Sequence, residues 1–354
     1  MDFGMFMEFQ TRPETSPAEA FDEGFDLVDA SEAWGLDAAW LAEFHFSPQR
    51  SVLSSPIAVA SAIAARTERM RIGMAVYVLP LNHPLRIAEE AVTVDQLSGG
   101  RFDLGVGRSG FTRIYRAYGV SYDESRARFD EAMAILKLAF AGEPFSFDGE
   151  FYQITEARLW PPPVQSPPPM RMAATTPPTF ETVGHEGLPI FVGLRGDGLD
   201  ELKASLDNYR TAWQAAGHPG AGNVYLRIPL YAGATEQGAR DDAEETLVYY
   251  FERQSQLVAA DAARRAAESG DAASADGARA KTAEALASLS YSDILASRVA
   301  VGSAPQLIER LGELQSELGL DGIVYEPNAG GLMHPAQVKE SLRILTHDVM
   351  PAFK

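Results

Sequence analysis

The sequence predicts an α/β fold, a (β/α)8 barrel with insertions, in a single domain that spans residues 1–354. Two observations carry this prediction. Short apolar segments alternate with amphipathic segments along the chain, and together they make eight strand–helix units. The length of 354 residues is long for an ordinary domain but normal for one barrel of this kind. Because periodicity alone does not show that a sheet closes, an open sheet of eight units is the alternative.

The predicted strands are short, mostly apolar runs bounded by turn-forming residues. In chain order we expect them at 2–8, 38–42, 71–79, 101–106, 170–174, 189–194, 224–231 and 322–325. The third is apolar almost throughout, as buried parallel strands are. Residues 145–154, around Asp148-Gly149, indicate a small inserted hairpin, and six prolines predict an extended segment at 160–169.

The predicted helices rest on apolar residues at helical spacing and on signals at helix ends. The first begins at the capping box Ser16-Pro17-Ala18-Glu19, and Ser303-Ala304-Pro305-Gln306 has the same form. We expect the other helices near 56–66, 87–97, 125–140, 179–186, 199–216 and 338–349.

One segment departs from this alternation. Residues 259–287 are mostly Ala, Ser, Gly, Asp and Arg. A long segment without secondary structure inside a compact domain is usually a functional lid or disordered. It lies between the seventh strand and the helix that follows, where the loops of a barrel cover the catalytic face. We therefore expect a mobile lid or a disordered insertion, with an alanine-rich surface helix and a loop as the alternative.

Charge and composition exclude several classes of function. The formal net charge of −19 argues against binding of nucleic acid or of an anionic membrane. The absence of cysteine excludes disulfides, thiolate metal sites and cysteine nucleophiles, and we expect no metal site. We expect a cytoplasmic protein, because no apolar run is long enough for a membrane span and Asp2 and Glu8 do not fit a secretory signal. An anionic cofactor would need a local arginine or backbone amides.

Gly105, Gly107 and Gly110 form a G-x-G-x-x-G sequence, which invites a dinucleotide-binding interpretation. That fingerprint requires a helix opening at its third glycine, and residues 111–116 have no clear amphipathic face. We favour a different site, in which Gly105 and Gly107 let the backbone approach a ligand and Arg108 clamps a phosphate at the C-terminal end of a strand. An ion pair between Arg108 and a nearby carboxylate is the alternative.

Several spaced blocks resemble the bacterial luciferase-like family of flavin-dependent monooxygenases. They are the opening MDFG at 1–4, WLAEFHF at 40–46, the segment 79–110 with NHPLRIAEE and SGGRF, and DVMP at 348–351. The resemblance covers nearly the whole chain. It implies a TIM barrel, reduced FMN (FMNH2) and O2 as cofactors, a separate flavin reductase that supplies the flavin, and a homodimer.

The resemblance also implies which residues contact the flavin. Ala75-Val76 falls where the family has a non-proline cis peptide beneath the flavin ring. Arg108 matches the arginine that holds the flavin phosphate. Thr176 and Thr179 match the loop after the fifth strand that also contacts the phosphate, where their hydroxyls and the amides of the next helix would be donors. Plain capping of that helix is the other interpretation of these threonines.

The chain departs from the family at one important position. The family's E-H-H-F is E-F-H-F here, and Phe44 stands where luciferase has its catalytic histidine. A phenyl ring cannot transfer a proton. His45 with Glu43 could serve instead, or Phe44 could shape an apolar substrate pocket, or His45 could pair with Glu43 for structural reasons only. Gly107 replaces a luciferase cysteine, which we expect to leave more room near the flavin.

The resemblance therefore implies an FMN-dependent monooxygenase of a two-component system that oxidises an organic, apolar substrate. Two rivals remain, a deazaflavin-dependent oxidoreductase with the same fold and a non-catalytic flavin-binding partner subunit. Family members usually pair through their early helices, and Ala58, Ala62 and Ala65 would permit close packing there. Ordinary packing of that helix on the barrel explains these alanines equally well.

Overall fold

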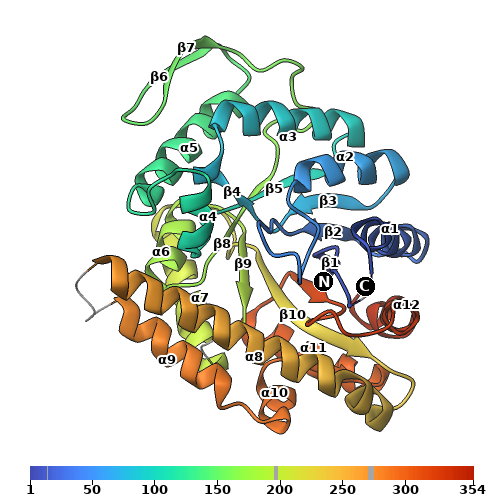
Figure 1. Ribbon diagram of the computed structural model, residues 1–354. Coiled ribbons are helices and arrows are strands. Elements are labelled where there is room, and N and C mark those ends of the chain that lie inside the picture. The colour runs from blue at the N-terminus through green and yellow to red at the C-terminus, as the bar shows by residue number, and fades with distance from the viewer. Residues whose placement is uncertain (14, 195–197, 270–274) are drawn as a thin grey trace.

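Eight parallel strands form a closed barrel in the computed structural model, which describes residues 1–13, 15–194, 198–269 and 275–354 (Figure 1). The strands are β1 (Asp2–Met7), β2 (Ala38–Leu41), β3 (Arg71–Met74), β5 (Phe102–Gly107), β8 (Met170–Ala173), β9 (Ile190–Gly193), β10 (Val224–Ala232) and β12 (Gly322–Glu326). Each pairs with the next, and β12 pairs with β1. This closure confirms the (β/α)8 barrel and excludes the open sheet.

Helices surround the barrel (Figure 1). They are α1 (Pro17–Ala33), α2 (Pro56–Arg66), α3 (Pro84–Ser98), α4 (Thr112–Ala117), α5 (Ser125–Phe140), α6 (Pro177–His185), α7 (Leu199–Ala215), α8 (Glu236–Ser269), α9 (Ala275–Ala287), α10 (Tyr291–Ser297), α11 (Ala304–Leu318) and α12 (Pro335–Ile344). None of them, within the described residues, is both long enough and apolar enough to cross a membrane.

The two predicted capping boxes have different outcomes. At the start of α1, Ser16 accepts a hydrogen bond from the Glu19 amide and the Glu19 carboxylate accepts one from Ser16, as predicted. At the start of α11, Ser303 is the N-cap but makes no such bond to the helix. Its hydroxyl bonds to the Gln306 side chain instead, so the prediction of a capping box there is wrong.

Three short elements lie outside the eight-strand pattern of the barrel: the hairpin β6–β7, β4 and β11. The hairpin β6 (Phe145–Asp148) and β7 (Gln153–Ala157) is confirmed and projects from the barrel next to α5 (Figure 1). The strand predicted at 71–79 is divided into β3 and the short β4 (Tyr77–Val78), which pairs with β5. Between the two strands, a cis peptide bond joins Ala75 to Val76. The short β11 (Ala300–Gly302) pairs with the end of β10.

An aromatic cluster fills the inside of the barrel. The ring of Trp40 meets those of Phe191 and Tyr225 edge-on, with centroids 5.0 and 6.0 Å apart. Phe6 and Val324 complete this inner cluster, and all five side chains are buried. Aromatic pairs in this geometry are favourable beyond the area that they bury. The inner cluster therefore closes the barrel below its C-terminal mouth.

The segment predicted as a lid or disordered insertion is helical where the structure describes it. Residues 259–269 are the end of α8 and 275–287 are α9, and the two helices pack side by side (Figure 1). Alanine has the highest helix propensity, and Ala262 and Ala283 are buried in this pair. The alternative of alanine-rich helices is therefore confirmed for these residues, while 270–274 lie outside the described part.

Helix α8 lies across the C-terminal mouth of the barrel. Along its length it contacts the last residue of β12 and the segments that follow β2 and β5. The Tyr250 hydroxyl lies 3.4 Å from Glu326, Arg253 donates to the carbonyl of Gln49 at 3.0 Å, and Asp261 accepts from the amide of Thr112 at 3.2 Å. The helix is thus fixed over the mouth by contacts to all of these segments.

Replacing Gly105 by alanine should destabilise the fold, because a Cβ at this position would lie 1.8 Å from the Met74 carbonyl oxygen. Overpacking of this kind costs about 1–3 kcal/mol, and a rigid backbone partner cannot move away. The matched control is Gly312→Ala in α11, where nothing lies within 4 Å and alanine favours the helix. Urea unfolding should show a loss for the first variant and none for the second. Equal stabilities of Gly105→Ala and the wild type would contradict the close approach of β5 to β3.

Candidate functional site

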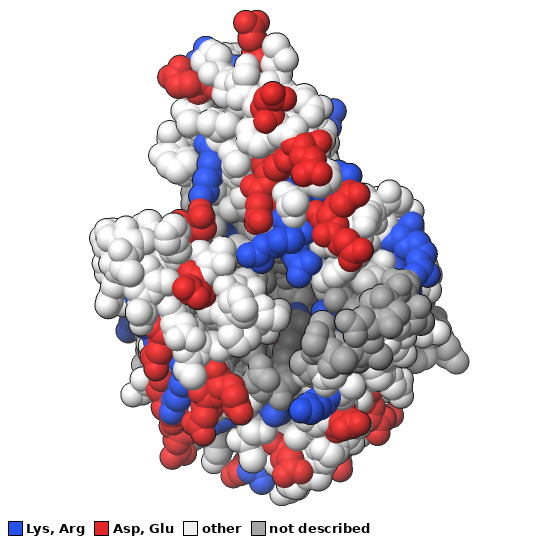
Figure 2. Space-filling view, turned by 90° about the vertical axis from the view of Figure 1, so that its left-hand side faces the viewer, with Lys and Arg blue, Asp and Glu red and all other residues white. Residues whose placement is uncertain are grey.

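The predicted site residues lie at the C-terminal ends of the barrel strands. Figure 2 shows a hollow near the middle of the surface in view, with Lys or Arg side chains gathered at its upper edge. In (β/α)8 barrels the segments that follow the strands at this end carry the functional groups.

Arg108 follows β5 directly and is half-buried. Its Nη1 donates to the Ser125 hydroxyl at 2.8 Å, its guanidinium lies 5.2 Å from the centre of the Tyr122 ring, and the Tyr115 hydroxyl donates to its carbonyl. Within the described residues Arg108 forms no ion pair, so the alternative of a carboxylate partner is not found. Most of the five N–H donors of its side chain remain for a ligand.

The segment that carries Thr176 and Thr179 starts next to the end of β5, because β8 is the neighbour of β5. Val106 stands opposite Met172 in this pairing, so the segment after β8 begins next to the end of β5. The two threonine hydroxyls are 2.9 Å apart at the start of α6. The Thr176 hydroxyl accepts no hydrogen bond from a backbone amide of α6, so plain capping by Thr176 is not found.

The amide donors expected at this helix are fewer than we predicted. The first two residues of α6 are Pro177 and Pro178, which have no N–H, and the Thr179 amide donates to the Thr176 carbonyl at 2.9 Å. The hydroxyls are therefore the donors that this turn offers beside Arg108.

Gly105 and Gly107 of the G-x-G-x-x-G sequence have a packing role that we did not predict. A Cβ on Gly105 would meet the Met74 carbonyl, and a Cβ on Gly107 would lie 2.4 Å from Cγ2 of Val76. Both glycines let β5 pack against the chain on either side of the Ala75-Val76 bond. The room expected at Gly107 is filled by the Val76 side chain, so that prediction is wrong.

Our sequence argument against dinucleotide binding was wrong in one step. A helix, α4, does follow the third glycine. Its buried residues Ile114 and Tyr115 pack with Val78 and Leu81, and the Asp261 carboxylate caps its start. The fold nevertheless excludes the dinucleotide-binding site that this fingerprint describes. The fingerprint requires an open sheet, whereas β5 belongs to a closed barrel.

Phe44, Ala75 and Val76 lie at the mouth of the barrel. All three are partly buried and pack on the inner cluster, together with Ala173. The Arg50 guanidinium lies 4.0 Å from the centre of the Phe44 ring, within the range of a cation–π contact. Phe44, which stands where luciferase has a histidine, is thus part of an apolar wall, and Arg50 packs on one face of its ring.

Glu43 and His45 form a pair apart from this wall. His45 Nε2 lies 2.7 Å from one Glu43 oxygen, and the other oxygen accepts from the Val78 amide at 2.7 Å. With its proton on Nε2, His45 accepts at Nδ1 from the Tyr118 hydroxyl at 3.2 Å. The side chains of Glu43 and His45 are 3% and 6% exposed, whereas Tyr118 is 44% exposed. The structural pairing that we weighed is present, and it connects a buried carboxyl group to the surface.

Burial raises the pKa of Glu43 above its ordinary value of 4.5, against smaller opposing effects of its bonds to His45 and Val78. The folded protein therefore keeps this proton to higher pH than the unfolded chain does. The contribution of Glu43 to the free energy of unfolding is fully present below pH 4.5, where both states are protonated. Between pH 4.5 and the pKa of the folded state, this contribution falls by about 1.4 kcal/mol per pH unit.

Glu43→Gln should remove this loss, because glutamine is neutral and of similar shape. We expect the unfolding free energy of the wild type, measured in urea at several pH values above 4.5, to fall relative to that of Glu43→Gln. Glu313→Gln, at an exposed position on α11, is the control and should follow the wild type. Parallel curves for the wild type and Glu43→Gln would contradict a raised pKa of Glu43.

A buried network of charges, which our sequence analysis did not identify, lies beside the inner cluster. Glu8 pairs with Arg50, and Arg227 pairs with Glu326 at 2.7 Å and lies 3.5 Å from Glu8. The Arg227 guanidinium also lies 3.4 Å from the centre of the Phe6 ring. Burial of Glu8 alone would raise its pKa, but the attraction and hydrogen bond of Arg50, with a further contribution from Arg227, lower it overall.

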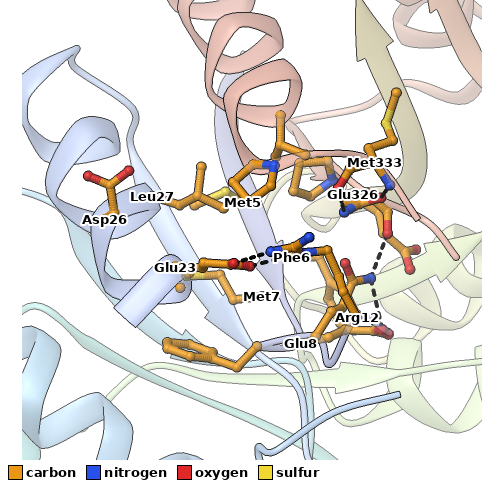
Figure 3. A pocket seen from close by; sticks show the side chains of 17 residues that line it. Met5, Phe6, Met7, Glu8, Arg12, Glu23, Asp26, Leu27, Glu326 and Met333 are labelled. Carbon is orange, nitrogen blue, oxygen red and sulfur yellow. Dashed lines mark hydrogen bonds and ion pairs between the residues drawn. The ribbon is translucent and has the colours of Figure 1, made fainter. Parts of the chain in front are cut away.

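Glu8 and Glu326 also line a pocket between α1 and the start of α12. Figure 3 shows Arg12 and Glu23 paired in this pocket, with Met5, Met7 and Leu27 around them. The only sequence signal for the network was the presence of single charged residues at the ends of apolar strands, as at Glu8 and Glu326. Nothing local indicated that they meet.

Known proteins resemble this chain in sequence. A family model described as luciferase-like monooxygenase matches residues 1–322. The alkanal monooxygenase α chain of the Kryptophanaron alfredi symbiont is 29% identical over 219 residues, which cover 62% of this chain and 61% of that protein. The chain thus matches about three-fifths of the length of this relative.

Solved structures share the fold. The monooxygenase RslO1 from Streptomyces bottropensis superimposes with a TM-score of 0.80 at 23% identity, with both chains fully covered. The oxygenating constituent of 3,6-diketocamphane monooxygenase from Pseudomonas putida, in complex with FMN, gives 0.77 at 19% identity, with 99% and 98% covered. An F420-dependent secondary alcohol dehydrogenase gives 0.74 at 16% identity, with 100% and 99% covered.

The structural likeness therefore does not distinguish between FMN and deazaflavin enzymes, because both kinds share this barrel. The sequence match is more specific, since it extends over most of the chain. By this match, the chain belongs to the luciferase-like monooxygenase family.

Proposed function

We propose that this chain is the FMN-dependent oxygenase component of a two-component system, which oxidises an organic, apolar substrate with reduced FMN and O2. The observation that carries the proposal is the position of Arg108 at the end of β5, without an ion pair in the described part of the chain, while Thr176 and Thr179 follow the neighbouring strand β8. This donor set fits a phosphate, because guanidinium and hydroxyl groups are strong donors to its oxygens. When bound, reduced FMN supplies the electrons that activate O2 for oxygen transfer.

In this proposal each predicted residue has a distinct task. Arg108, Thr176 and Thr179 would hold the phosphate, and Ala75 and Val76 would contact the flavin ring. Phe44 and the inner cluster would provide an apolar wall that keeps water from the reacting atoms. His45 would exchange a proton between the buried Glu43 and Tyr118 at the surface. The α8–α9 pair would act as the lid.

A homodimer and a flavin reductase partner are further parts of the proposal. Ala58 and Ala65 of α2 are exposed and Ala62 is half-buried, whereas Ala60 and Ala64 of the same helix are buried. Packing of α2 on its own barrel therefore does not explain the first three alanines, and this supports a face for a second copy. We also expect the protein to be cytoplasmic, like the source of its reduced flavin.

The test is reconstitution with a flavin reductase, FMN, NADH and 18O2, followed by product analysis with a panel of terpenes, aldehydes and polycyclic aromatics. We expect a product that carries one 18O atom. Binding of deazaflavin with hydride transfer, and no 18O in any product, would favour the deazaflavin alternative. Binding of FMN without any product or oxygen consumption would favour a non-catalytic flavin-binding subunit.

A further inference from the structure

A second groove on the catalytic face is lined by basic residues and by no acidic residue. It lies between the loop after β2, α4 and α8, and it encloses about 800 Å³ of space that is partly open to solvent. Its lining residues are Phe46, Ser47, Pro48, Gln49, Arg113, Arg253, Gln256 and Leu257. Two of these are arginines and none is acidic, although the chain has 49 acidic and 30 basic residues.

Neither arginine of this groove has an acidic partner within the described residues. Arg113 donates to the carbonyl of Phe46 at 3.0 Å, to the carbonyl of His45 at 3.3 Å and to the hydroxyl of Ser47 at 3.1 Å. Arg253 donates to the Gln49 carbonyl and to the Tyr249 hydroxyl, both at 3.0 Å. These neutral acceptors fix the direction of both guanidinium groups and leave their charges uncompensated. Because other exposed arginines of this acidic chain pair with carboxylates, as Arg126 does with Asp130, this arrangement favours recognition of an anion.

An apolar surface lies next to the two charges. Phe46 is 55% exposed, and its ring lies 6.1 Å from that of Tyr118, which is also exposed. Leu257 of α8 lines the same groove. A ligand with both an apolar part and a negative charge would therefore use the two kinds of surface together.

The two arginines of the groove belong to or contact segments that also form the proposed site. Arg113 holds the carbonyl of His45, the residue that follows Phe44, and Arg253 belongs to the helix that crosses the mouth of the barrel. A molecule bound in the groove thus lies at the edge of the mouth through which a substrate reaches the inner cluster.

We propose that this groove binds an anionic group of the substrate, so that the largely apolar substrate of the proposed function also carries one carboxylate or phenolate. The anionic group lies between Arg113 and Arg253, and the apolar body packs on Phe46 and enters the mouth toward Phe44. The designation of the bound molecule as substrate rests on the proposed function, whereas binding of the anion does not.

The test uses 1-naphthoate and 1-naphthalenemethanol, which share a ring system and differ in charge, with dissociation constants measured by calorimetry. We expect the wild type to bind naphthoate at least about tenfold more tightly than the alcohol, the size expected of one charge-assisted interaction. Arg113→Gln/Arg253→Gln should lose this preference, and Arg113→Lys/Arg253→Lys should recover part of it. Arg126→Gln is the control and should keep the preference. Phe46→Ser should weaken both probes equally.

Equal affinity of the wild type for the two probes, no binding of either probe, or a preference that survives in the double glutamine variant would overturn the proposal. FMN affinity, measured in the same variants, separates this inference from the proposed function. If FMN affinity rather than naphthoate affinity falls in the double variant, the groove belongs to the cofactor and the inference is wrong. If the wild type prefers naphthoate but does not bind FMN, the inference that the groove binds an anion is supported and the proposed function is wrong.

Discussion

Replacing Arg108 by alanine should weaken FMN binding by about 10- to 100-fold, since hydrogen bonds to a charged group contribute about 1.5–3 kcal/mol. The structure supplies the reason. Arg108 stands at the end of β5, is oriented by Ser125, and has no ion pair within the described residues. A phosphate bound there would lose its only guanidinium in our proposal, and the hydroxyls of Thr176 and Thr179 carry no charge to replace it. Quenching of flavin fluorescence measures the affinity.

Riboflavin provides the sharpest control for this experiment, because it has the flavin ring but no phosphate. The affinity of Arg108→Ala for riboflavin should equal that of the wild type. Arg126→Ala, at an exposed position on α5, should leave the FMN affinity unchanged. An FMN affinity that is intact in Arg108→Ala, or an equal loss for FMN and riboflavin, would show that Arg108 does not hold the phosphate.

Replacing Arg227 by methionine should lower the free energy of unfolding by about 3–5 kcal/mol, because removal of one partner leaves a buried charge uncompensated. Glu326 is 2% exposed, and one of its oxygens has no hydrogen-bond partner in the described part of the chain. Lys339→Met is a matched control. Lys339 also lies 2.7 Å from its partner Asp26, but these side chains are 39% and 59% exposed. Such an exposed pair contributes about 0–1 kcal/mol.

The double variant Arg227→Met/Glu326→Gln tests the cause of this loss. If the loss of stability in Arg227→Met comes from the unpaired carboxylate of Glu326, then Glu326→Gln should restore a large part of the free energy of unfolding. Urea unfolding of the four proteins closes the cycle. Equal losses for Arg227→Met and Lys339→Met would mean that burial does not decide the strength of these two pairs.

The parts of this protein that the sequence predicted correctly depend on local patterns. The strands and helices of the barrel follow from apolar periodicity, and the capping box at Ser16 needs only residues three positions apart. The position of Arg108 directly after an apolar strand was predicted in the same way, whereas its role in binding a phosphate stays a prediction. The hairpin at Asp148-Gly149 likewise depends on a turn and the strands on either side.

The parts that we missed depend on partners far away in the sequence. Helix α4 has no clear amphipathic pattern, and Asp261, which caps it, lies 149 positions away from Thr112. The roles of Gly105 and Gly107 depend on the chain around Ala75-Val76, which reaches them only after the barrel closes. The charge network joins Glu8, Arg50, Arg227 and Glu326 across almost the whole chain, so no window of sequence contains it.

The helix that crosses the mouth of the barrel has a consequence for how the mouth can open. Helix α8 is a single continuous element, and its contacts at Tyr250, Arg253 and Asp261 join it to the last residue of β12 and to the segments that follow β2 and β5. A helix moves as a rod, because its backbone hydrogen bonds resist local bending. We therefore expect a displacement at the groove beside Arg253 to be transmitted along the helix to Asp261 and to the start of α4. Under our proposal, the opening of the mouth and the position of the segment that carries Arg108 would then change together.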